Sequence, residues 1–168
     1  MNDKQNLIKR IAKNAIVLAL YVALNFISYP IAYANLQFRL SEILILLCFF
    51  NRDYIIPVTL GCFLSNLASP FMPWDLLIGT TATFISSLLV SFSPYLGIAV
   101  LFPIAANSFL VGIEYVMYLK LPYLYSVGII ALGESVVVIL SYILFLLIMK
   151  KEFMMNLISA KRKRDFKW

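Results

Sequence analysis

The sequence predicts an all-α integral membrane protein, built as a bundle of six transmembrane helices. Of its 168 residues, 62% are apolar and only 13% are charged, whereas about a quarter of the residues are charged in a soluble domain. Six apolar segments, separated by polar or proline-marked breaks, take up nearly the whole chain. Residues 1–168 therefore form a single membrane domain, with no room for a separate catalytic domain.

The six expected segments are residues 11–29, 36–50, 54–69, 74–92, 95–118 and 123–149. The first, fourth, fifth and sixth approach or exceed the ~20 residues that a helix needs to cross a bilayer. The second and third are short and are separated only by Asn51, Arg52 and Asp53, so two short helices and one interrupted element both remain open. No small-residue cleavage site follows the first segment, so we do not expect a signal peptide.

The basic residues indicate the number of spans and their orientation, because Lys and Arg collect in cytoplasmic loops. The N-terminal segment 1–13 and the C-terminal tail 150–168 are both basic, so both termini should be cytoplasmic and the number of spans even. Six spans also place Arg52 inside and leave only Arg39 and Lys120 outside. We interpret the tail as a topology anchor against anionic lipid rather than as a nucleic-acid-binding patch.

Four acids, Glu42, Asp75, Glu114 and Glu134, lie within or at the mouths of the apolar segments. An acid in hydrocarbon costs a few kcal/mol or more, and is rarely found there without a partner or a task. With the termini inside, all four acids map to the outer half of the bilayer, while the inner half holds long uncharged runs. The sequence therefore predicts a polar pocket that opens to the outside.

An excess of acids and amides over bases favours a ligand that is rich in hydrogen-bond donors and cationic. An aromatic residue near the outer end could stack on a planar ring, although aromatic residues there also form the interfacial belt. The candidate substrate-binding residues are Glu134, Glu114, Asn107, Asn66, Asp75, Glu42, Arg39 and Trp74. Structural alternatives stay open, since Arg39 could pair with Glu42 three residues on and Asp75 could stabilise a helix start.

Ala15, Ala19 and Ala23 recur at four-residue spacing on the first segment. Small residues on one helical stripe let another helix approach closely in lipid. The stripe is therefore either a docking face for another subunit or a site of packing within the bundle.

Several kinds of chemistry are not supported by the sequence. It contains no histidine and only two cysteines, Cys48 and Cys62, which read as small core residues, so we expect no metal site. No GxxxxGK[ST] phosphate loop and no Ser-His pair is present, which argues against an ATPase of that type and against hydrolytic catalysis. We expect neither an enzyme nor a cofactor.

The run Gln37-Phe38-Arg39-Leu40-Ser41-Glu42 resembles the QueT family, the membrane-embedded substrate-binding (S) components of energy-coupling factor (ECF) transporters. The resemblance continues through residues 61–67, 75–80 and 131–135. It implies a six-helix S-component fold in a bacterial plasma membrane and a queuosine precursor as ligand, such as 7-aminomethyl-7-deazaguanine. It also implies a transmembrane coupling subunit, which docks at the alanine stripe, and two ATPase subunits as partners.

Other functions remain open beside this one. An S component for another vitamin would share the fold, because a fold does not name its ligand. An autonomous secondary transporter could use the intramembrane acids as a proton relay. A membrane enzyme that acts on lipid would need a nucleophile and a base that the sequence does not supply.

Overall fold

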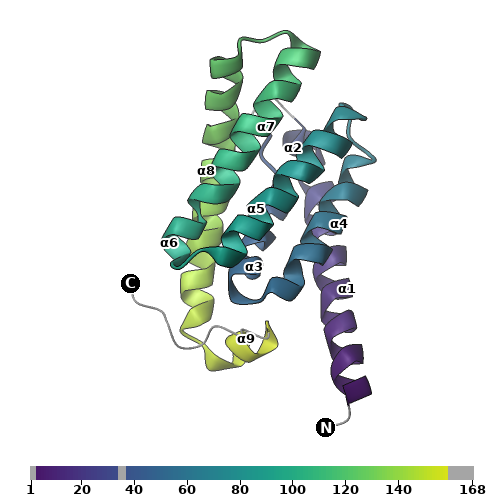
Figure 1. Cartoon of the computed structure of the whole chain (residues 1–168), viewed down its shortest axis with the longest axis vertical. Coiled ribbons are helices and arrows are strands. Elements are labelled where there is room, and N and C mark those ends of the chain that lie inside the picture. Colours follow the sequence, from purple (N-terminus) through teal and green to yellow (C-terminus); the bar gives the residue numbers. More distant parts are fainter. Residues whose placement is uncertain (1–2, 34–36, 159–168) are drawn as a thin grey trace.

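The computed structural model of the chain describes residues 3–33 and 37–158. These residues form helices joined by turns, with no β-strand among them (Figure 1). The elements are α1 (Asp3–Ile27), α2 (Tyr29–Ala32), η1 (Leu40–Leu46), α3 (Leu47–Phe50), η2 (Arg52–Tyr54), α4 (Ile55–Asn66), η3 (Asp75–Gly79), α5 (Thr80–Phe92), α6 (Leu96–Ala99), α7 (Leu101–Leu119), α8 (Tyr123–Met149) and α9 (Glu152–Leu157).

Within the described ranges, three helical stretches are long and apolar enough to cross a membrane: Asp75–Phe92, Leu96–Leu119 and Tyr123–Met149. A shorter apolar stretch covers Leu40–Phe50. The 25 residues of α1 reach about 37 Å at ~1.5 Å per residue, and its first turns are basic. The expectation of an all-helical chain with membrane-capable helices is confirmed, while the count of six spans and the orientation of the termini stay predictions.

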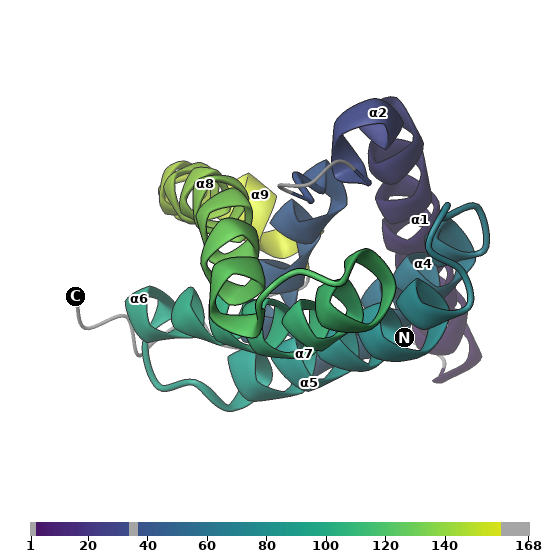
Figure 2. The same cartoon turned by 90° about the horizontal axis from the view of Figure 1, so that it is seen from above.

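The helices enclose η1 and α3. Helix α7 packs against α8, α1 packs against α4, and α5 contacts both α4 and α7. Seen from above, α4, α5 and α7 line one side of the bundle, and η1 lies between α1 and α8 on the other side (Figure 2). The residues of η1, and Arg39 just before it, are thus held in the interior.

The main hydrophobic core is built around the segment from Leu44 to Phe50, in which every side chain is buried. An apolar helix without a polar face is typical of an element enclosed by others. A smaller cluster joins α5, α7 and α8 through Ala82, Val111, Tyr115 and Ile130. Burial on all sides explains why residues 44–50 lack the polar stripe that marks a surface helix.

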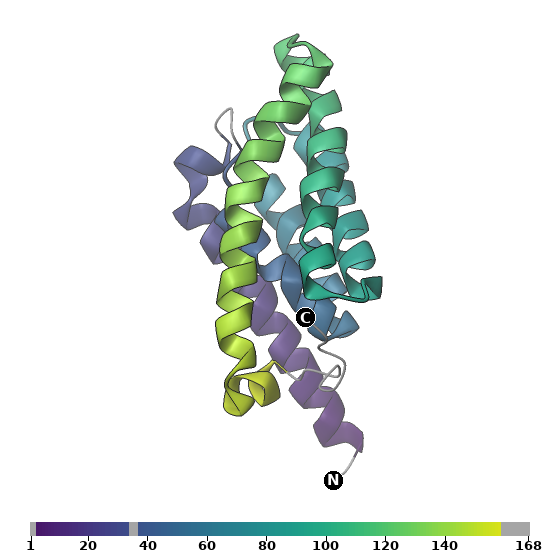
Figure 3. The same cartoon turned by 90° about the vertical axis from the view of Figure 1, so that its left-hand side faces the viewer.

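The second and third expected segments are two short helices rather than one interrupted helix. Asn51 adopts an extended backbone conformation after α3, and its Oδ1 accepts a hydrogen bond from the Asp53 N–H at 3.0 Å. This side-chain turn reverses the chain into α4. Helix α8 runs nearly the whole height of the molecule, and α9 folds back at its lower end (Figure 3), the end at which the first turns of α1 also lie (Figure 1).

Candidate functional site

A buried ion pair joins Arg39 to Asp75. The guanidinium Nη2 lies 2.5 Å from the Asp75 Oδ1, and the two side chains are 5% and 0% exposed. The second carboxylate oxygen of Asp75 accepts a hydrogen bond from the Ser69 hydroxyl. Arg39 therefore pairs with Asp75 rather than with Glu42, since its backbone is extended and not helical. Asp75 lies in the first turn of η3, which has no side-chain cap.

Asn66 and Gly79 complete the surroundings of this ion pair. The Asn66 Nδ2 donates to the backbone carbonyl of Asp75 at 2.8 Å. A Cβ added at Gly79 would lie 3.1 Å from the Asp75 Oδ1, 3.2 Å from the Asn66 Nδ2 and 3.4 Å from the Arg39 Nη1. A side chain larger than that of Gly79 would therefore have to displace one of these polar side chains by a few tenths of an ångström.

Tyr33 braces the loop that carries Arg39. The guanidinium carbon of Arg39 lies 5.2 Å from the centroid of the Tyr33 ring, within the range of a cation–π contact. Burial raises the pKa of the Tyr33 hydroxyl, which keeps it protonated and able to donate to the Ser65 carbonyl at 2.9 Å. The same hydroxyl accepts from the Asn25 Nδ2 at 2.9 Å, so α1, the loop and α4 are tied together.

Glu42 lies in η1 and is 1% exposed. Its Oε1 accepts a hydrogen bond from the Tyr21 hydroxyl of α1 at 2.7 Å, and its Oε2 has no partner within the described structure. The Tyr21 ring packs against Gly61 of α4, where an added Cβ would lie 2.8 Å from the Tyr21 Cβ. The side-chain amide of Asn107 lies beside the carboxyls of Glu42 and Glu134.

Glu114 and Glu134 are buried acids whose carboxyl groups keep oxygens without hydrogen-bond partners among the described residues. They are 0% and 2% exposed, and neither oxygen of Glu114 has a hydrogen-bond partner among the described residues; the Glu134 Oε2 also has none. A buried polar group without a partner costs about 1–3 kcal/mol, and more when it is charged. Such groups in a folded protein call for an explanation, and a ligand that supplies donors is one.

The four acids gather around Arg39. Glu134 interacts electrostatically with Glu42 and Arg39, and Glu114 interacts with Asp75 and Arg39. We use "acid cluster" for Glu42, Asp75, Glu114, Glu134, Arg39, Asn107 and Gln37. Residues from the loop before η1 and from η1, η3, α7 and α8 thus meet in one place.

Of the remaining candidates, Asn66 contacts the cluster through the Asp75 backbone. Trp74 is half-buried at the start of η3.

Two contributors, Gln37 and Tyr21, were not among the predicted site residues. Gln37 is 2% exposed and has a left-handed backbone with φ 45°. Its side chain lies against the Tyr115 hydroxyl, and its Nε2 has no partner within the described ranges. Gln37 could have been found from the sequence, because it is a polar residue close to Arg39 and Glu42. No such pattern marks Tyr21, which is one of many apolar and aromatic residues in α1.

The alanine stripe lies on the outside of the molecule. Ala15, Ala19 and Ala23 are all exposed, and Ile16, next to Ala15, is 65% exposed. Tyr21, on another face of α1, is 1% exposed. Packing of the stripe within the bundle is therefore wrong as an explanation for its small residues.

Within the described residues, no group of three or more His, Cys, Asp or Glu side chains could hold a metal ion. Cys48 and Cys62 are both buried as free thiols.

Comparison with known proteins identifies the family. The family profile described as QueT transporter matches residues 11–150. A relative from Lactococcus lactis subsp. cremoris (strain MG1363), named queuosine precursor transporter QueT, is 35% identical over 138 residues, which is 71% of this chain and 80% of the relative. No solved structure matches the chain. Both the family and the relative are transporters and not enzymes, and the chain belongs to the QueT transporter family.

Proposed function

We propose that the chain is the membrane-embedded substrate-binding subunit of an ECF-type importer, and that it captures a queuosine precursor of the 7-deazaguanine type from outside. The observation that carries this proposal is the set of buried carboxyl oxygens without partners on Glu42, Glu114 and Glu134. The names of the family and of the relative favour a queuosine precursor over another vitamin.

The ligand chemistry fits these acids. The guanine-like edge of 7-aminomethyl-7-deazaguanine offers two adjacent N–H donors, and its aminomethyl group is a cation. A carboxylate accepts from two adjacent donors in a bidentate geometry. We assign the guanine-like edge to Glu134, because the Asn107 amide beside it can serve the remaining ring heteroatoms.

The aminomethyl cation is assigned to Glu114. Both oxygens of this carboxyl are open, and the nearby Arg39 is neutralised by Asp75 at 2.5 Å. A paired guanidinium repels an incoming cation less than a free one would, since the two charges of the pair largely cancel at a distance. Asn66 would support the pair, and Trp74 would stack on the ligand ring.

Energy for uptake would come from partner subunits. The sequence has no phosphate loop of the GxxxxGK[ST] type, so two separate ATPase subunits would hydrolyse ATP. The exposed alanines of α1 would dock on a transmembrane coupling subunit, because small residues allow close helix contact in lipid. In this proposal, both termini lie in the cytoplasm of a bacterial cell and the chain crosses the plasma membrane six times.

Calorimetry on the purified chain in detergent tests the substrate. We expect 7-aminomethyl-7-deazaguanine to bind in the absence of any partner, with a dissociation constant in the micromolar range or below. 7-Deazaguanine, which lacks only the aminomethyl cation, is the matched comparison and should bind more weakly. Absence of binding at micromolar concentration would contradict the proposed substrate.

A proton-coupled transporter that works alone is the second candidate. Buried carboxyls without partners, such as those of Glu114 and Glu134, are also the groups that carry protons through membrane proteins. Proteoliposomes that contain only this chain distinguish the two functions. Uptake driven by a pH gradient would favour the second candidate, whereas binding without uptake supports a subunit that depends on partners.

A further inference from the structure

Gln37 is a buried amide without a hydrogen-bond partner at its nitrogen. The residue is 2% exposed, and its Nε2 has no partner within the part of the chain that the structure describes. An amide nitrogen carries two N–H donors, and their burial without an acceptor costs free energy. An acceptor that arrives with a ligand would explain why this donor is left open.

The backbone around Gln37 directs its side chain and that of Arg39 into the bundle. Gln37 has a φ of 45°, which is uncommon for residues other than glycine. The N–H of the next residue, Phe38, donates to the Ile31 carbonyl of α2 at 3.1 Å and fixes the loop there. Gln37 and Arg39 are both buried, and Phe38 between them is half-buried. A backbone conformation of this kind is costly and is often found where a protein holds a ligand.

The Gln37 side chain lies next to the acids to which the proposed function assigns the ligand. The hydroxyl of Tyr115 in α7 lies beside it, and Tyr115 interacts electrostatically with Arg39 and Glu114. Arg39 also interacts with Glu114 and Glu134. The loop before η1 is therefore close to both acids.

Open acceptors and open donors of the acid cluster come from different parts of the chain. Among the described residues, the carboxyl oxygens without partners belong to η1, α7 and α8, whereas the side-chain nitrogens without partners are Gln37 Nε2 and Arg39 Nε. Both nitrogens lie in the loop before η1. A ligand that satisfies the whole cluster thus needs at least one acceptor beside its N–H groups and its cation.

We propose, resting on the proposed function, that the Gln37 Nε2 donates to the ring oxo group of the ligand and makes the site selective for this group. In 7-aminomethyl-7-deazaguanine, the oxo oxygen lies between the N–H edge assigned to Glu134 and the aminomethyl group assigned to Glu114. A neutral amide serves this oxygen without bringing a positive charge closer to the aminomethyl cation, which donation from Arg39 would do. Asn107 is left for the ring nitrogens.

Calorimetry on the full chain in detergent tests this role with two probes that differ in a single atom. They are 7-aminomethyl-7-deazaguanine and its 6-thio analogue, in which sulfur, a weaker acceptor, replaces the oxo oxygen while the N–H edge and the cation stay. We expect the wild-type chain to bind the oxo compound about 10-fold more tightly than the thio compound. Gln37→Met keeps the length of the side chain but removes its donors. It should weaken binding of the oxo compound about 10-fold and of the thio compound less than about two-fold.

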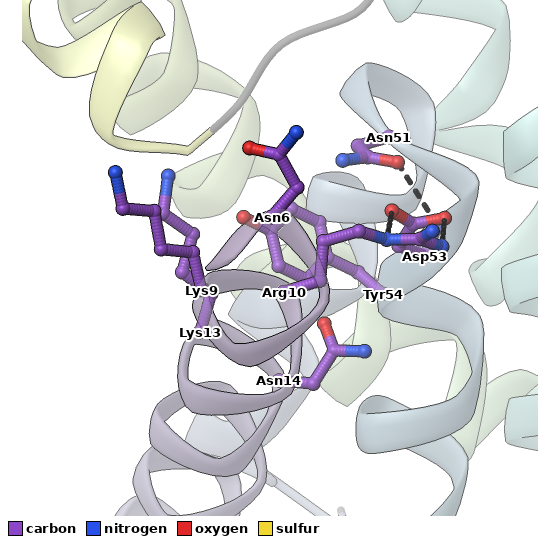
Figure 4. A pocket seen from close by; sticks show the side chains of 8 residues that line it. All are labelled: Asn6, Lys9, Arg10, Lys13, Asn14, Asn51, Asp53 and Tyr54. Carbon is purple, nitrogen blue, oxygen red and sulfur yellow. Dashed lines mark hydrogen bonds and ion pairs between the residues drawn. The ribbon is translucent and has the colours of Figure 1, made fainter. Parts of the chain in front are cut away.

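Two further variants serve as checks on folding and on specificity. Gln37→Asn suits the positive φ better but withdraws the amide by one methylene, so it should also lose the preference for the oxo compound. Asn14→Leu makes a like change from amide to apolar in a separate pocket between α1 and the turn from α3 to α4 (Figure 4). The described residues that line this pocket include none of the acid cluster, so the preference should stay within about two-fold of the wild-type value.

The outcomes separate the role of Gln37 from the choice of substrate. Absence of binding of both probes to the wild-type chain would overturn the proposed substrate and this role together. Binding of the oxo compound with an unchanged preference in Gln37→Met, or an equal loss for both probes, would overturn the role of Gln37 alone.

Discussion

Arg39 and Asp75 are 36 positions apart in the sequence, yet their side chains form an ion pair of 2.5 Å in the interior of the bundle. The pair joins the loop before η1 to the π turn η3, which leads into α5. It also sets the charge of the acid cluster, because one of the four acids is already matched. In the proposed function, the other three acids receive the ligand.

Arg39→Met should destabilise the protein strongly. The substitution leaves the Asp75 carboxylate buried without its cation, which typically costs about 3–5 kcal/mol. Thermal unfolding in detergent measures the effect. Arg10→Met is the control, because Arg10 is 61% exposed in its ion pair with Asp53 and exposed pairs contribute only about 0–1 kcal/mol. Equal shifts in the two variants would contradict the structural role of the buried pair.

Glu134→Gln should weaken binding of 7-aminomethyl-7-deazaguanine by roughly 10- to 100-fold, because one of the two bidentate acceptors becomes a donor. Calorimetry in detergent gives the dissociation constant. Glu152→Gln, which makes the same change on exposed α9, should leave the constant unchanged. An unaltered affinity in Glu134→Gln would contradict the assignment of Glu134 to the guanine-like edge of the ligand.

Glu114→Gln should change selectivity more than affinity for the ring. If this carboxylate faces the aminomethyl cation, its loss weakens binding of the cationic ligand by about 10-fold. Binding of 7-deazaguanine, which lacks only that cation, should be nearly unaffected. Paired titrations with the two compounds measure the ratio. A uniform loss for both compounds would show that Glu114 supports the fold of the site instead of reading the charge.

Ala19→Trp should spare ligand binding and abolish association with the coupling subunit. A large ring at the centre of the exposed alanine stripe keeps another helix at a distance. Co-purification of the coupling subunit and calorimetry measure the two properties separately. Ala105→Trp, at an exposed position of α7, should affect neither. Normal co-purification of Ala19→Trp would contradict the docking face.

Gly79→Ala should destabilise the protein by about 1–3 kcal/mol, as expected when a methyl group is forced into a packed site. The added carbon would lie 3.1 Å from the Asp75 Oδ1 and would push the ion pair apart. Gly128→Ala is the matched control, because a Cβ there meets nothing within 4 Å, and alanine is favoured over glycine in a helix. An equal fall in the melting temperatures of Gly79→Ala and Gly128→Ala would contradict the expected crowding of Gly79 against the ion pair.

The helices were predictable where flanking residues mark their ends. Residues 123–149 were expected as a span and form α8 with those bounds, since Pro122 precedes the apolar run and Lys150 follows it. The residues from Leu44 to Phe50 are apolar and enclosed by the other helices, so the sequence gave no signal for the point at which η1 ends and α3 begins. The segment from Leu40 to Phe50 divides into η1 and α3 and ends in the turn at Asn51. These features depend on contacts with other helices, which the sequence of this segment alone does not show.

The acids of the site could be found from the sequence because a charge in an apolar chain is conspicuous. Their partners could not. The spacing of Arg39 and Glu42 allowed a local pair as one alternative. The backbone of Arg39 is extended, however, and η3 lies close to it, so the guanidinium pairs with Asp75. Tyr21 reaches Glu42 only through the packing of α1 on η1, which no local pattern predicts.

Helix α1 faces two ways, with its alanines exposed and the Tyr21 hydroxyl bound to Glu42 at 2.7 Å. A partner subunit that docks on the alanines and tilts α1 would move the Tyr21 hydroxyl away from the Glu42 carboxyl. Because the ring is tight against Gly61, the helix has little freedom to turn without moving α4 as well. Docking of the partner on the alanine face would then break the hydrogen bond between Tyr21 and Glu42. The acid cluster would bind its ligand less tightly once the partner is docked.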